Sequence, residues 1–74
     1  MYRKMHLRSE IKRSKNRIEE LEKKRSRSQA ALVAAILAHT EPNDEDVDYF
    51  NGFTKEIDAE REKLRALIAQ YEQL

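Results

Sequence analysis

Few side chains in this sequence have the types and spacing that chemistry requires. The chain has no cysteine, which excludes disulfides and thiolate metal sites. Its two histidines, His6 and His39, are far apart, and His39 lies near the expected end of a helix, where the cationic form of histidine is favoured. We therefore expect no enzyme activity, no metal site and no cofactor.

Five carboxylates, here named the acidic cluster, fall within eight residues: Glu41, Asp44, Glu45, Asp46 and Asp48. Carboxylate oxygens suit a divalent cation, but a calcium loop also requires a fixed ligand spacing and a central glycine, and both are missing here. Acidic residues in the first turn of a helix are stabilised by the positive end of the helix dipole. We therefore interpret the cluster as the start of a helix.

Basic residues dominate the first part of the chain. Residues 1–28 carry eleven Lys or Arg against four Glu, a net charge of +7, whereas residues 41–74 carry four Lys or Arg against ten Asp or Glu, a net charge of −6. Clustered lysines and arginines can bind the phosphates of nucleic acids. The candidates for such an anion-binding surface, here named the basic stem, are Lys12, Arg13, Arg17, Lys23, Lys24 and Arg27. Because four glutamates interrupt this segment, we expect any binding of nucleic acid to be weak.

The elements that position these residues follow from a heptad pattern. Spacings of four and three alternate from Leu7 to His39, through Ile11, Ser14, Ile18, Leu21, Arg25, Ser28, Leu32 and Ala35. This pattern predicts a helix over about residues 7–39. Pro42 disfavours helical backbone at the preceding residue, and Asn43 is a good N-cap for a second helix.

The second helix is predicted over about residues 44–73, with a turn at 40–43. Its stripe consists of Val47, Phe50, Thr54, Ile57, Arg61, Leu64, Ile68 and Tyr71. The pair Asn51-Gly52 is a turn signal. Because the heptad passes through this pair in phase, we predict a continuous helix, with a break that leaves a short helix at 44–50 as the alternative.

Together the two stripes predict an all-α fold, an antiparallel two-helix, coiled-coil-like hairpin that forms a single domain over residues 1–74. Such packing places a positions opposite d positions. The predicted pairs include Ile11–Tyr71, Ser14–Ile68, Ile18–Leu64 and Leu32–Phe50.

The residues from Ala30 to Ala38 form the longest apolar run, with nine consecutive apolar residues. A helix that is apolar all round must be covered on every side. Five large side chains do not fit into the seam of a two-helix hairpin, and they are here named the apolar tip: Val33, Ile36, Leu37, Tyr49 and Phe53. We therefore expect a homodimer that completes a four-helix bundle, or burial against a helix of another protein. Two hairpins packed antiparallel about a two-fold axis would bring an acidic turn to a basic stem.

These features predict a small protein–protein interaction module: an adaptor, a co-chaperone or an assembly factor. No stretch reaches the ~18 apolar residues of a membrane span. We expect a cytoplasmic protein with no membrane contact and no small-molecule substrate. Nucleic-acid binding through the basic stem is the alternative.

Two resemblances add to this interpretation. The segment from Thr54 to Asp58, followed by Leu67, Ile68 and Tyr71, resembles the Ser-Gln-Glu-Leu-Asp helix of the small sporulation-control aspartyl-phosphate phosphatases, which are also helical hairpins. That resemblance implies a regulatory phosphatase that acts on a response regulator through Glu56 and Asp58. In that family the Leu-Ile pair directly follows the Asp, whereas here AEREKLR intervenes. In size and architecture the chain also resembles the small hairpin co-chaperones of type III secretion systems, which cover the apolar helix of a partner subunit.

Overall fold

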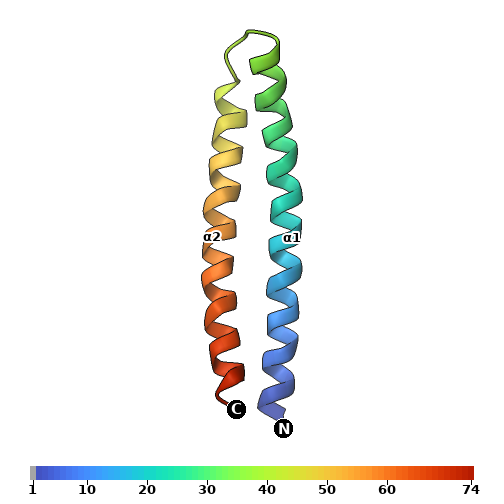
Figure 1. Ribbon diagram of the computed structural model, residues 1–74, viewed down its shortest axis with the longest axis vertical. Coiled ribbons are helices and arrows are strands. Elements are labelled where there is room, and N and C mark those ends of the chain that lie inside the picture. Colours follow the sequence, from blue (N-terminus) through green and yellow to red (C-terminus); the bar gives the residue numbers. More distant parts are fainter. Residues whose placement is uncertain (1) are drawn as a thin grey trace.

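The computed structural model describes residues 2–74, which form a rod of two antiparallel helices (Figure 1). Helix α1 spans Tyr2–Leu37 and helix α2 spans Asp44–Glu72. The rod measures 57 × 15 × 14 Å, and the described residues contain no strand. The predicted all-α hairpin is therefore confirmed. Neither helix is both long enough and apolar enough to cross a membrane.

The end of α1 is a left-handed cap centred on His39. The His39 N–H donates to the Ile36 carbonyl at 3.1 Å, and the Thr40 N–H donates to the Ala35 carbonyl at 3.0 Å. These two bonds form a Schellman motif, in which the residue after the cap adopts a positive φ. His39 adopts that conformation, with φ of 57°. The sequence predicted that the helix extends to about residue 39, whereas the cap ends it at Leu37.

The start of α2 is capped as the sequence indicates. The side chain of Asn43 accepts a hydrogen bond from the Glu45 N–H at 3.0 Å. Asp44, Glu45 and Asp46 occupy the first turn, where anions interact favourably with the helix dipole. The helix then continues through Gly52, so the alternative with a break at this residue is wrong.

The core is a narrow seam between the two helices. Its buried residues are Leu7, Ser14, Ile18 and Leu21 of α1 and Ile57 of α2. All five belong to the stripes predicted from the heptads, and most of the other stripe residues are half-buried. A domain of this length buries too little surface to be more than marginally stable alone.

The register of the hairpin differs from the predicted one. Ser14, predicted to lie opposite Ile68, instead donates a hydrogen bond to the carboxylate of Glu60 at 2.9 Å and lies 3.5 Å from its carbonyl oxygen. Glu60 precedes Ile68 by two helical turns. Tyr71, predicted to lie opposite Ile11, has the Lys4 ammonium 5.4 Å from its ring centroid. Together with the hydrogen bond between Arg8 and Tyr71, these contacts displace the helices from the predicted register by about one helical turn, so the predicted register is wrong.

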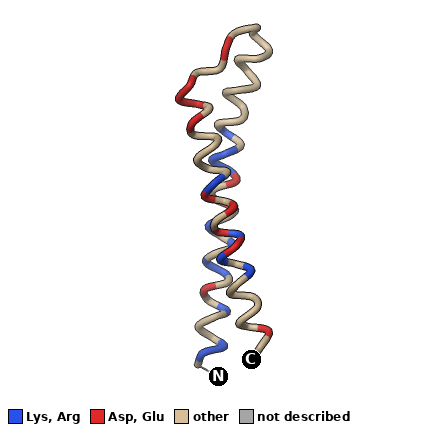
Figure 2. Tube along the Cα trace, turned by 90° about the vertical axis from the view of Figure 1, so that its left-hand side faces the viewer, with Lys and Arg blue, Asp and Glu red and all other residues tan. Residues whose placement is uncertain are grey.

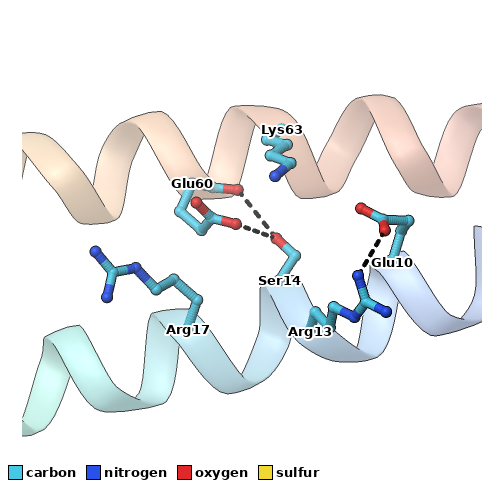
Figure 3. A pocket seen from close by; sticks show the side chains of 6 residues that line it. All are labelled: Glu10, Arg13, Ser14, Arg17, Glu60 and Lys63. Atoms are coloured by element: carbon cyan, nitrogen blue, oxygen red, sulfur yellow. Dashed lines mark hydrogen bonds and ion pairs between the residues drawn. The ribbon is translucent and has the colours of Figure 1, made fainter.

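One longer contact spans this offset. Arg61 forms an ion pair with Glu22 at 3.5 Å. Helical side chains lean toward the N-terminus of their own helix, so in an antiparallel pair two long side chains lean toward each other. Arg61 and Glu22 can therefore meet although their backbones lie at different heights. The Glu60 side chain also spans a difference in height, because Figure 3 shows Ser14 opposite Lys63 and Arg17 opposite Glu60.

Candidate interaction surfaces

The apolar tip lies at the end of the rod that carries the connection between the helices. Its side chains are largely exposed: Val33 by 45 %, Ile36 by 62 %, Leu37 by 75 % and Tyr49 by 55 %. Phe53 is half-buried, and its ring stacks on that of Tyr49 with centroids 6.4 Å apart. Large exposed apolar groups gathered in one region mark interaction sites on soluble proteins.

The hairpin covers this end of α1 only in part. In Figure 1 the end of α1 reaches a little beyond the start of α2, and the connection at residues 38–43 passes over this end of the rod. Leu32, Ala35 and Phe50, which the sequence placed in the seam, are half-buried. Val47, placed there as well, is exposed. The seam therefore loosens toward the tip.

Acidic residues gather at the end of the rod that carries the connection, whereas Lys and Arg lie along the rest of α1 (Figure 2). The last turns of α1 carry no charge, and the acidic cluster occupies the connection and the start of α2. No Lys or Arg occurs between Arg27 and Lys55. The acidic cluster thus has no basic partner near it in the sequence.

The basic stem is solvent-exposed at all six positions. Arg13 forms an ion pair with Glu10 at 3.1 Å, one helical turn away. Such exposed pairs contribute only ~0.2–1 kcal/mol. The stem therefore offers positive side chains to a partner, with glutamates placed among them.

An open groove of about 330 Å³ lies where the stem meets α2 (Figure 3). It is lined by Glu10, Arg13, Ser14, Arg17, Glu60 and Lys63. The buried Ser14 hydroxyl points at Glu60 and is occupied by that hydrogen bond. The lining contains no histidine that could activate this serine. The arrangement satisfies a buried polar group and holds the helices in register.

The opposite end of the rod holds a second group of contacts. Arg8 Nη2 donates a hydrogen bond to the Tyr71 hydroxyl at 3.0 Å. This hydrogen bond lowers the pKa of Tyr71, and the charges of Arg8 and Lys4 act in the same direction, whereas partial desolvation opposes them. The same hydrogen bond raises the pKa of Arg8. These contacts tie the start of α1 to the end of α2.

This end also exposes apolar side chains that reasoning from the sequence missed. Tyr2 is 88 % exposed and Met5 is 67 % exposed. With His6 and Ser9 they line an open depression of about 160 Å³. Their signal in the sequence was weak, because residues 1–6 precede the first position of the heptad pattern.

The remaining candidate chemistry is dispersed. His6 lies at the terminal end and His39 in the connection, and no group of metal-ligating side chains occurs in the part of the chain that the structure describes. Glu56 and Asp58, which the resemblance to the phosphatases singles out, are both exposed. Residues two positions apart in a helix do not face each other, so these two carboxylates diverge. No family model, curated protein or solved structure matches the chain.

Proposed function

We propose that this protein is a protein–protein interaction module that uses the apolar tip. The observation that carries the proposal is the exposure of Val33, Ile36, Leu37 and Tyr49 on a hairpin in which only five of residues 2–74 are buried. A large apolar side chain that becomes fully buried contributes about 1.5–3 kcal/mol. Burying several of them against another chain therefore provides stability that a lone hairpin lacks. The occupant is a second copy, which would complete a four-helix bundle, or a helix of another protein.

Sedimentation velocity tests self-association, with wild type and Leu37→Asp compared over a wide concentration range. Leu37 is exposed in the hairpin, so this change should leave the helicity of a monomer almost unaltered. We expect wild type to form dimers and the variant to dissociate at least ~10-fold more readily, the equivalent of losing one buried side chain. Ala66→Asp, an exposed site far from the tip, is the matched control and should behave as wild type.

The same variants test the second kind of occupant. A partner helix should be retained by immobilised wild type and by Ala66→Asp after nuclease treatment, and lost with Leu37→Asp. A wild-type protein that remains monomeric and folded, with no partner that distinguishes the variants, contradicts the proposal. That result would mean that the exposed tip has no binding role.

Nucleic-acid binding through the basic stem is the second candidate, because all six stem side chains are exposed. We expect only weak, non-specific binding that is lost by physiological salt, since contacts to phosphate weaken steeply as salt rises. Fluorescence anisotropy with labelled duplex and single-stranded DNA measures it. If binding is micromolar at physiological salt, survives Leu37→Asp and disappears with Lys23→Glu/Lys24→Glu, the stem and not the tip is the functional surface.

A further inference from the structure

The two ends of the rod share a property that its middle lacks. Tyr2 and Met5 are exposed at the terminal end, and Val33, Ile36 and Leu37 are exposed at the tip. Between them, residues 6–32 of α1 have no large hydrophobic side chain that is exposed. A chain that covers this helix along its length must therefore be apolar at both ends and polar between them, as the hairpin itself is.

The charges of the two ends are opposite. The acidic cluster lies at the tip end of the rod, and four of its five side chains are exposed. Arg3, Lys4 and Arg8 are exposed at the terminal end. Two copies joined tip to tip would bring their acidic clusters together, and like charges facing each other oppose association. Two copies packed antiparallel place each acidic cluster beside a basic end.

The terminal end also has room for an apolar side chain. The depression lined by Tyr2, Met5, His6 and Ser9 has a volume of about 160 Å³ and lies open to solvent. Because the depression is open, an exposed apolar side chain of another chain can contact Tyr2 and Met5 there.

We propose that the occupant of the apolar tip is the terminal end of a second copy of this chain, in a two-fold antiparallel dimer. Leu37 of each copy lies against Tyr2 and Met5 of the other, and the acidic cluster of each lies beside Arg3, Lys4 and Arg8 of the other. Because the axis is two-fold, both contacts occur twice. This inference rests on the proposed function of the tip and names its partner and the orientation of that partner.

Disulfide cross-linking tests the orientation without background, because the chain has no cysteine. Met5→Cys and Leu37→Cys are prepared separately, mixed, and oxidised under mild conditions; mass spectrometry identifies the linked pairs. A disulfide requires Cα atoms within about 7 Å, whereas the tip and the terminal end lie near opposite ends of a 57 Å rod. We expect the 5–37 link in the mixture to form at least tenfold faster than the 37–37 link in Leu37→Cys alone.

The possible results separate this inference from the proposed function. A 37–37 link that forms faster than the 5–37 link overturns the antiparallel dimer and leaves a tip-to-tip interaction intact. If sedimentation gives a monomeric mass and neither disulfide forms faster than it does in the urea-unfolded protein, both the antiparallel dimer and self-association through the tip are overturned.

Charge reversal at the terminal end provides a second measurement. Arg3→Glu should weaken the antiparallel dimer several-fold and should leave a tip-to-tip dimer unaltered. High salt should weaken the former and favour the latter. Dimerisation that Arg3→Glu leaves unaltered counts against the proposed pairing of ends.

Discussion

The hydrogen bond from Ser14 to Glu60 joins the two helices across the seam, and replacing Ser14 with alanine tests how much it stabilises the hairpin. The Ser14 side chain is 2 % exposed, and its hydroxyl lies 2.9 Å from the Glu60 carboxylate. A hydrogen bond to a charged group contributes about 1.5–3 kcal/mol, and a neutral one about 0.5–1.5 kcal/mol. Because Glu60 is only half-buried, water can replace the lost donor in part. We therefore expect Ser14→Ala to lower the free energy of unfolding by about 1–2 kcal/mol.

The matched control is Ser26→Ala, at an exposed serine of the same helix. Alanine has a higher helix propensity than serine, by up to about 0.7 kcal/mol, and both variants share this gain. The difference in stability between them therefore measures the loss of the hydrogen bond. Urea unfolding followed by circular dichroism at a single protein concentration gives both values, because association makes stability depend on concentration. In thermal unfolding, each 1 kcal/mol corresponds to about 4–8 °C for a domain of this size.

A double-mutant cycle completes the test. Ser14→Ala, Glu60→Ala and the double variant should give a coupling energy of about 1–2 kcal/mol, since either single change removes the same bond. Additivity within about 0.3–0.5 kcal/mol would falsify the contact. So would a Ser14→Ala variant at least as stable as Ser26→Ala, which is the result expected if Ser14 faced Ile68, because the serine would then have no partner across the seam.

Three further expectations follow from the backbone and the terminal contacts. Gly52→Ala should stabilise the protein by about 1 kcal/mol in urea unfolding, because a Cβ there meets no atom within 4 Å. The reverse change at an exposed helical site, Ala66→Gly, should lower the free energy of unfolding by a similar amount. A destabilised Gly52→Ala variant would contradict a continuous α2. His39→Gly should raise the melting temperature, because a left-handed backbone costs a non-glycine residue about 1–2 kcal/mol, whereas unchanged melting would indicate that the cap is frayed in solution. In an alkaline titration of tyrosinate absorbance, Arg8→Gln should move the ionisation of Tyr71 to higher pH, because it removes the hydrogen bond that lowers the pKa of Tyr71. The pKa of Tyr71 is lower in the folded protein than in the unfolded chain. The hydrogen bond with Arg8 therefore adds to the free energy of unfolding as the pH rises above the folded pKa, and this added stability is lost as the pH falls through the folded pKa.

Local patterns in the sequence predicted the elements and the face that each helix buries. The heptads identified Leu7, Ser14, Ile18, Leu21 and Ile57 as seam positions, and these are the buried residues. Asn43 was recognised as an N-cap from residue type and position alone. Such features depend on neighbours within one or two turns, which the sequence displays directly.

The register was not accessible in the same way. A heptad stripe that slides by one helical turn past its partner still presents stripe positions to stripe positions, so apolar periodicity alone does not distinguish the two alignments. What distinguishes them is a specific polar contact. Ser14 meets a carboxylate acceptor in one register and the apolar Ile68 in the other. A buried polar residue in a coiled-coil seam commonly specifies register for this reason.

The shift in register also accounts for what the sequence missed at both ends of the rod. It brings Tyr71 to Lys4 and Arg8, so the first residues of α1, expected to lie outside the helix, gain a partner and form helix from Tyr2. The same slide loosens the seam toward the tip, where Val47, predicted to lie in the seam, is exposed. The displacement that leaves apolar surface uncovered at the tip therefore also orders the terminal end, which carries Tyr2 and Met5. If an antiparallel dimer forms, each copy covers the surface that this register leaves open in the other.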